Sequence, residues 1–146
     1  MDRANYNAGE PGPLASHFSI IVLLVDDHAE VRIVLAYMVA HICPEATIAQ
    51  ASDGAEALEA ISQQHPNLII TDYQMPNLSG LELVRILRAR GDTLPIVLIS
   101  SDPDIATVVL AEGATAFLPK PFPLADLKHL LHLLLFEGEA ARAVGG

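Results

Sequence analysis

With 146 residues, the chain can form one compact domain and leaves little room for a second. Because 51% of the residues are hydrophobic and only 18% are charged, the composition excludes a disordered signalling tail and suits a sheet covered by helices on both faces. The formal net charge of -10 disfavours contact with phosphate backbones, so we expect a basic protein surface or a metal ion as partner rather than nucleic acid.

Strands and helices are predicted to alternate along most of the chain. Residues 1–18 combine Gly, Pro and Asn without apolar periodicity, which predicts a flexible leader, and residues 138–146 predict a similar tail. Between them, residues 19–137 alternate short apolar runs with helical patterns, as is typical of an α/β domain with a doubly wound parallel sheet. The five predicted strands are 20–26, 46–51, 67–72, 94–100 and 115–118.

Five helices are predicted to flank this sheet. Three of them are expected to begin with capping boxes, in which a short side chain and an acid three residues later bind free helix-terminal amides. These pairs are Asp27 and Glu30, Asp53 and Glu56, and Ser79 and Glu82. Asp102 and Pro103 mark a fourth start, with Pro at the first helical position, and the fifth helix is predicted at about 123–136.

The first predicted helix has an apolar stripe that we expect to face the core. The stripe consists of Val31, Val34, Leu35, Met38 and Ile42. Ile33 and Tyr37 lie outside it, and both ordinary surface positions and a partner-docking role are open for them.

The last predicted helix has more apolar residues than one core-facing stripe needs. The expected stripe is Leu124, Leu127, Leu130, Leu131 and Leu134, and the surplus residues are Leu133, Leu135 and Phe136. The surplus fits either an interface or a tail that folds back over it. His129 and His132 lie on the polar side, where we expect solvent contact rather than a metal site.

Acidic residues stand at the predicted ends of two strands. Asp26 and Asp27 follow the first apolar run, and Asp72 follows the third. The carboxyl ends of parallel strands meet at one edge of the sheet, so these carboxylates are expected to share a pocket. Like charges that close repel one another unless a divalent cation is bound. The sequence therefore predicts a magnesium site with a reactive aspartate beside it.

The ends of the later strands add a hydroxyl and a cation. Ser100 ends the fourth predicted strand, and Lys120 follows the fifth. A carboxylate such as Asp72 can attack a phosphoryl group in line if nearby cations offset the charge on the transferring oxygens. A lone strand-end Asp is often only a helix cap, and a lone Lys is usually solvated. The prediction therefore depends on four strand ends that deliver complementary groups.

Several motifs of this chain together resemble those of a known family. They are Asp26-Asp27, Asp72-Tyr73-Gln74-Met75-Pro76, Gly80, Ser100 and Lys120-Pro121-Phe122. From about residue 20 to 136 the chain is similar to the receiver domains of two-component response regulators, a superfamily that includes the chemotaxis response regulators. The resemblance implies a flavodoxin-like strand order of 2-1-3-4-5.

The resemblance also implies roles for the acidic residues. Asp72 would accept a phosphoryl group from a sensor histidine kinase or a histidine phosphotransfer protein. Asp27, Asp72 and the backbone carbonyl of Gln74 would bind Mg2+ directly, and Asp26 would do so directly or through a water. Lys120 would pair with the phosphoryl oxygens.

Further positions match the switch of the family. The hydroxyl of Ser100 would bond the phosphoryl group and pull the following loop inward, and the aromatic ring of Phe117 would turn into the space that this movement frees. Pro121 would follow a cis peptide, and Gly80 would allow a tight turn before the third helix.

The chain departs from its relatives after the switch hydroxyl. Ser101 stands where many relatives have Ala, and it would either slow access to the phosphoryl pocket or add a hydrogen bond. Asp102 is expected to act as a helix cap. The stretch from Ser100 to Lys120 is shorter than in chemotaxis-type relatives, so the fourth helix is expected to be short.

The function expected from this resemblance is a signalling switch in which phosphorylation changes the affinity for a downstream protein. Alternatives are a receiver cut from a DNA-binding transcription factor and a phosphate-independent docking module. Phosphatases of the haloacid dehalogenase type need a second acid two residues after the nucleophile, where this chain has Gln74. We therefore expect self-phosphotransfer and slow autodephosphorylation rather than multiple-turnover enzyme activity. The surplus apolar residues of the last helix would form a phosphorylation-dependent homodimer.

Features of the sequence also indicate a compartment. The single Cys43 can form no internal disulfide and is expected to be a small apolar residue near a helix end, which fits a reducing compartment. No apolar run approaches the roughly 20 residues that span a bilayer, and residues 1–5 lack a signal-peptide pattern. We expect a cytoplasmic protein without a membrane partner.

Overall fold

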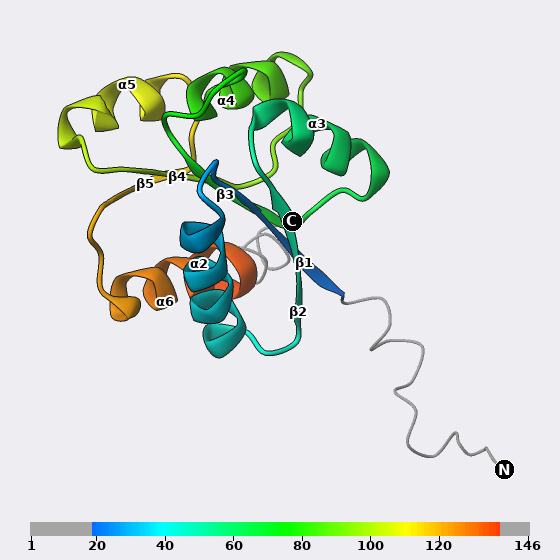
Figure 1. Ribbon diagram of the computed structural model, residues 1–146, viewed down its shortest axis with the longest axis vertical. Coiled ribbons are helices and arrows are strands. Elements are labelled where there is room, and N and C mark those ends of the chain that lie inside the picture. Colours follow the sequence, from blue (N-terminus) through cyan, green and yellow to red (C-terminus); the bar gives the residue numbers. More distant parts are fainter. Residues whose placement is uncertain (1–18, 138–146) are drawn as a thin grey trace, which may run out of the picture.

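A computed structural model describes residues 19–137 of the chain, and its sheet has five parallel strands. The predicted leader and tail lie outside the described residues. The strands are β1 (Ile20–Val25), β2 (Ala46–Ala51), β3 (Leu68–Asp72), β4 (Ile96–Ser100) and β5 (Ala116–Pro119). Their order is β2-β1-β3-β4-β5 (Figure 1). The predicted flavodoxin-like fold and all five predicted strands are confirmed, with boundaries that differ by at most two residues.

Helices cover both faces of this sheet. They are α2 (Ala29–Ile42), α3 (Gly54–Gln63), α4 (Gly80–Ala89), α5 (Ala106–Ala111) and α6 (Leu124–His132). A 3-10 turn at Pro103–Ile105 leads into α5, and a π-helical turn at Leu133–Glu137 continues α6. Figure 1 shows α3, α4 and α5 on one face and α2 and α6 on the other. The predicted short fourth helix is confirmed, because α5 has six residues.

The central strands contribute to two cores, one on each face of the sheet. Leu23 of β1 packs with residues of α3 and α4, and its neighbour Leu24 packs with residues of α2 and α6. Successive side chains of a strand point to opposite faces, so one apolar run can fill both layers. Burial of each such leucine contributes about 1.5–3 kcal/mol, and these cores hold the strand ends in fixed positions.

The predicted N-cap residues are correct at three turns and wrong at one. The predicted capping box at Asp53 forms only in part, because the side chain of Glu56 accepts the N–H of Ser52 rather than that of Asp53. Ser79 and Glu82 form the predicted reciprocal capping box of α4. The side chains of Asp53 and Asp102 accept hydrogen bonds from backbone N–H groups of the turns that they open. The prediction for Asp27 is wrong: the N-cap of α2 is His28, which makes no side-chain cap bond.

The predicted core stripe of α2 is partly wrong. Val31 and Val34 are exposed, at 39% and 58%, whereas Leu35 and Val39 are buried. α2 carries apolar residues on almost every side, so the periodicity fits two overlapping stripes. Packing against β1, β2 and α6 selects the stripe that contains Val39.

The predicted stripe of α6 needs a similar correction. Leu127 and Leu131 are buried as predicted, but Leu124 is exposed at 39%. Leu135, predicted as surplus, packs against the core formed with α2, because the π-helical turn rotates the residues that follow His132. Leu133 and Phe136 are exposed, as are His129 and His132.

Two further expectations concern the surface and the compartment. Cys43 at the end of α2 is buried, in agreement with its predicted apolar role. Within residues 19–137, every helix falls short of the length and hydrophobicity that crossing a bilayer requires.

Candidate functional site

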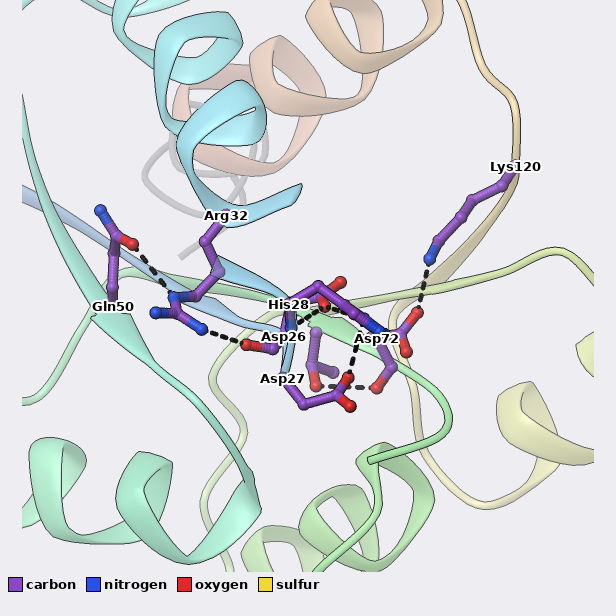
Figure 2. A network of polar contacts seen from close by, with 8 residues as sticks. Asp26, Asp27, His28, Arg32, Gln50, Asp72 and Lys120 are labelled. Carbon is purple, nitrogen blue, oxygen red and sulfur yellow. Dashed lines mark hydrogen bonds and ion pairs between the residues drawn. The ribbon is translucent and has the colours of Figure 1, made fainter. Parts of the chain in front are cut away.

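The carboxyl edge of the sheet brings together acidic and basic side chains from distant parts of the sequence. Asp26 follows β1, Asp72 ends β3 and Lys120 follows β5. Figure 2 shows Asp26, Asp27 and Asp72 side by side, with the Lys120 side chain reaching toward Asp72. Ser100 ends β4 at the same edge of the sheet, between β3 and β5. The sequence-predicted strand ends therefore meet in one place.

Lys120 and Asp72 form an ion pair at the centre of this site. The Nζ of Lys120 lies 2.8 Å from Oδ1 of Asp72, and the two side chains are 35% and 12% exposed. The backbone N–H of Lys120 donates to the carbonyl of Ser100 at 2.9 Å, which aligns the end of β5 with the end of β4. The Lys120–Pro121 peptide is cis, as the family resemblance implies.

The pKa of the Asp72 carboxyl is raised above its ordinary value. Burial is the main cause, and the negative charges of Asp26 and Asp27 add to it, while the hydrogen bond and charge of Lys120 act in the opposite direction. Lys120 therefore does not offset the combined effect of burial and of the two neighbouring carboxylates on Asp72. A divalent cation would favour the ionised form of all three.

Asp27 provides an observation that independently favours a cation. Its Oδ1 is buried and makes no hydrogen bond among the described residues, although the Nδ1 of His28 lies 3.3 Å away. Asp26, Asp27 and His28 each offer a ligand atom within 4.8 Å of the others. Carboxylate oxygens are the ligands that Mg2+ prefers, so the residues present fit this ion. Gln74, the predicted carbonyl ligand, is exposed and lies two residues after the end of β3.

Asp26 is fixed by hydrogen bonds at both its backbone and its side chain. It is only 4% exposed. Its N–H donates to the carbonyl of Ala51 at 3.1 Å, which extends the ladder between β1 and β2. Its Oδ1 accepts the N–H of His28 at 2.9 Å, and its carbonyl accepts Nη1 of Arg32 at 2.6 Å.

Sequence reasoning missed three residues around the acidic cluster. Arg32 binds the carbonyl of Asp26 and the side chain of Gln50 (Figure 2). The side-chain hydroxyl of buried Thr71 donates to the carbonyl of Asp72 at 3.0 Å. His28 follows the acidic pair directly and could have been included in it by adjacency. Arg32 and Thr71 carry no signal in the pattern alone, because their partners are backbone carbonyls.

Gly80 has a different role from the predicted one. Its backbone is not in the left-handed region, which Asn77 of the same loop adopts with a φ of 68°. A Cβ at position 80 would overlap the carbonyl oxygen of Asp72, and the N–H of Gly80 donates to the carbonyl of Tyr73 at 2.9 Å. Glycine is therefore required by the close approach of α4 to the end of β3.

The hydroxyl side of the site lies at the end of β4. Ser100 is 8% exposed, and its Oγ accepts the N–H of Asp102 at 3.1 Å. Ser101 is exposed, and Asp102 caps the 3-10 turn as predicted. Phe117 on β5 is half-buried and packs against the core formed with α3 and α4.

Comparison with known proteins identifies a family and related sequences. A family model described as the response regulator receiver domain matches residues 22–132. The response regulator MprA of Mycobacterium ulcerans is 39% identical over 119 residues, which are 80% of this chain and 50% of the relative. MprA of Mycobacterium tuberculosis is 37% identical over 119 residues, which are 80% of this chain and 51% of the relative. The chain thus spans about half the length of these relatives.

Solved structures share the fold. Chemotaxis protein CheY4 of Vibrio cholerae has a TM-score of 0.71 at 28% identity, and the match covers 80% of this chain and 98% of that one. The receiver domain of the sensor histidine kinase PA1611 from Pseudomonas aeruginosa has a TM-score of 0.71 at 25% identity with the same coverage. In that structure a magnesium ion is coordinated in the active site cleft.

Proposed function

This chain belongs to the response regulator receiver domain family, and from that premise we propose that Asp72 accepts a phosphoryl group from a phosphohistidine. The donor would be a sensor histidine kinase or a histidine phosphotransfer protein, and the phosphorylated chain would control a downstream protein. The observation that carries the proposal is the Asp72 carboxylate, 2.8 Å from the Lys120 amino group. Beside this pair lies a buried Asp27 oxygen that receives no hydrogen bond from any of residues 19–137.

The proposed step is an in-line displacement at phosphorus. A carboxylate oxygen of Asp72 forms a bond to phosphorus while the bond from phosphorus to the histidine nitrogen breaks, and the electron pair of that bond stays on the imidazole. Lys120 moves from the carboxylate to the phosphoryl oxygens and neutralises part of their charge. Mg2+, when bound, would supply the remaining positive charge. Asp26, Asp27, Asp72 and the carbonyl of Gln74 would hold it.

Ser100 and Phe117 are proposed to convert this chemistry into a change of shape. Ser100 is close to the phosphoacceptor strand because β4 pairs with β3, with Asp72 opposite Ile99. Its Oγ now accepts the N–H of Asp102, and a bond from this hydroxyl to the phosphoryl group would pull the loop after β4 toward the site. Phe117 is half-buried, and inward rotation of its ring would follow that movement.

We propose a phosphoacceptor rather than a multiple-turnover enzyme. A hydrolase built on a strand-end Asp needs an acid two residues later for proton transfer, and this chain has an exposed Gln74 there. Slow autodephosphorylation is still expected, because an acyl phosphate reacts with water.

One alternative role concerns the whole protein, a DNA-binding regulator of which this chain would be the receiver. The match to half of each MprA relative is compatible with a receiver cut from a DNA-binding regulator, although nothing in the acidic composition favours direct DNA contact.

The exposed Leu133 and Phe136 are consistent with the predicted homodimer through the last helix, which solution mass with and without a phosphodonor would test. A buried free Cys43 agrees with the cytoplasmic location that we propose.

Intact mass tests the proposed function directly. The full chain is incubated with acetyl phosphate in the presence and absence of Mg2+, alongside Asp72→Asn and the control Asp53→Asn, which removes a carboxylate that caps α3. We expect one added phosphoryl group, dependent on Mg2+, in the wild type and in Asp53→Asn but not in Asp72→Asn. No added mass in the wild type would favour a phosphate-independent docking module.

A further inference from the structure

Arg32 places a positive charge next to a site that is suited to bind a cation. It lies in the first turn of α2 and half-buries its side chain between the ends of β1 and β2. Its Nη1 donates to the backbone carbonyl of Asp26 at 2.6 Å, and its Nε donates to Oε1 of Gln50 at 3.1 Å. Figure 2 shows the guanidinium bridging Gln50 and Asp26, with the Asp27 and Asp72 carboxylates beyond it.

The hydrogen bond from Arg32 acts on the peptide that joins Asp26 to Asp27. The carbonyl of Asp26 belongs to the Asp26–Asp27 peptide unit, which is planar, so a bond to this oxygen restricts the backbone on both sides. The Asp26 N–H is already bound to Ala51, and its carboxylate to the N–H of His28. The guanidinium therefore holds the backbone carbonyl of Asp26, the polar group of this residue that those two bonds leave free.

We propose that Arg32 is a positioning residue for the Mg2+ site: with Gln50 it fixes the Asp26–Asp27 peptide so that both carboxylates face Asp72 before the ion binds. The inference rests on the proposed function, because it concerns the same site. Groups that hydrogen-bond to metal ligands typically change metal affinity about 10- to 100-fold. A charged donor such as a guanidinium forms the stronger kind of hydrogen bond to the carbonyl.

Two physical effects of Arg32 on Mg2+ affinity have opposite signs. Its charge repels a second cation, so removal of the charge alone would tighten Mg2+ binding. Its hydrogen bonds order the ligands, so their removal would weaken binding. The ordering effect is the larger one, because the guanidinium binds the Asp26 backbone carbonyl and the Gln50 amide rather than a carboxylate.

Calorimetric titration of the full chain with MgCl2 separates these effects. For Arg32→Gln, which removes the charge and shortens the side chain, we expect about tenfold weaker Mg2+ binding. Arg32→Lys keeps the charge but has one ammonium group in place of the planar fork, so it should also bind Mg2+ more weakly than the wild type. Gln50→Ala leaves Arg32 intact and removes only its outer partner, and we expect a smaller loss of two- to threefold, about the effect of one weak hydrogen bond.

Arg88 offers a matched control. It too donates to backbone carbonyls, to that of Gly113 at 2.9 Å and to that of Asp92 at 2.8 Å, but these lie in the loops before β5 and β4 at the opposite edge of the sheet. Arg88→Gln should lower the unfolding temperature without changing Mg2+ affinity. Thermal unfolding of every variant sets a temperature at which all are folded; should Arg32→Gln not fold, Arg32→Lys and Gln50→Ala provide the test.

About tenfold weaker Mg2+ binding in Arg32→Gln, with unchanged binding in Arg88→Gln, supports the inference. Wild-type affinity or tighter binding in folded Arg32→Gln overturns it and shows that charge dominates. An equal loss in Arg88→Gln also overturns it, because the effect would then be general. A wild-type chain that binds no Mg2+ overturns both this inference and the proposed function, whereas normal wild-type binding with unchanged variants overturns this inference alone.

Discussion

The two sides of the candidate site are held in different ways. On the side of β1, Asp26 is bound through its N–H, its carbonyl and its carboxylate, by partners on β2 and α2. On the same side, α4 approaches so closely at Gly80 that no side chain fits there, and its capping box fixes the turn. We call the residues from Asp26 to Arg32 and from Asp72 to Gly80 the anchored side.

The segment after β4 is held by short local bonds. Ser100 Oγ accepts from Asp102, and Asp102 accepts from Asp104 at 3.0 Å. Residues 101–104 are exposed, and the helix that follows has six residues and no side-chain cap. We call residues 100–111 the movable side. Segments with few buried contacts open most easily. Under the proposed function, we therefore expect the anchored side to bind the ion and the movable side to respond to phosphorylation.

The largest effect is expected for Lys120→Ala, which removes the cation that pairs with Asp72. Loss of one group that stabilises transition-state charge costs roughly 100- to 1000-fold in rate, and we expect such a decrease in phosphoryl uptake from acetyl phosphate, followed by intact mass. Mg2+ affinity should not fall, since the anchored side keeps its ligands. Lys128→Ala on the exposed surface of α6 is the control. Weaker Mg2+ binding in Lys120→Ala would show that the anchored side alone does not hold the ion.

A test of the anchored side is Gly80→Ala. The new Cβ would overlap the carbonyl oxygen of Asp72, so either α4 or the end of β3 has to move. We expect the free energy of unfolding to fall by about 2–3 kcal/mol, measured by urea denaturation. Gly91→Ala is the comparison, because its Cβ has open space and only its φ of 81° is unfavourable. It should cost about 1 kcal/mol, and an equal loss at both positions would contradict the close-approach argument.

The movable side is tested by Ser100→Ala, which removes the acceptor of the Asp102 N–H. The free energy of unfolding should fall by about 1 kcal/mol, the net value of one hydrogen bond. Phosphoryl uptake should continue, but the accompanying change in partner affinity or hydrogen exchange should be lost. Ser101→Ala, at the neighbouring exposed position, should change at most the rate of uptake and keep the accompanying change in partner affinity or hydrogen exchange. Loss of uptake in Ser100→Ala would instead assign this hydroxyl to the chemistry.

The smallest effect concerns Asp53, which links α3 to the anchored side. Its carboxylate binds the N–H of Glu56 and the side chain of Asn77, and these bonds lower its pKa below the ordinary value of 3.8. A lowered pKa means that the ionised form stabilises the fold above pH 3.8 and that this contribution is lost as the pH falls through the folded-state pKa.

Asp53→Asn keeps a capping side chain but removes the charge. Near neutral pH we expect the free energy of unfolding of this variant to be about 0.5 kcal/mol lower than that of the wild type. The difference should shrink toward zero in acid, below the folded-state pKa of Asp53. Urea denaturation at both pH values measures this, with Glu59→Gln, an exposed charge of α3, as control. A stability difference between Asp53→Asn and the wild type that grows in acid would contradict a lowered pKa of Asp53.

Most of the fold was predictable because β1, β3 and β4 are short apolar runs with a polar residue at or directly after their ends. The same pattern predicted Asp26, Asp72 and Ser100 as strand-end residues, since the geometry of parallel sheets brings such ends together. The wrong prediction at Asp27 is informative. Its spacing to Glu30 is that of a capping box, but the carboxylate belongs to the acidic cluster, and the site overrides the local preference.

Other features could not be read from periodicity. α2 is apolar on almost every side, so only packing decides that Val39 is buried and Val34 is exposed. The π-helical turn that brings Leu135 to the core shifts the register after α6 has begun, and no pattern of 3.6 residues contains it. Arg32 was missed because its main partner is a backbone carbonyl from another element.

Hydrogen–deuterium exchange of the phosphorylated chain tests the central claim most directly. Exchange is compared for the full chain in Mg2+ alone and in Mg2+ with acetyl phosphate, with Asp72→Asn treated in parallel. We predict that phosphorylation changes exchange in residues 100–111 and around Phe117, leaves residues 26–32 as they are in Mg2+ alone, and has no effect in Asp72→Asn. Equal changes on the anchored and movable sides, or changes confined to residues 26–32, would contradict the account.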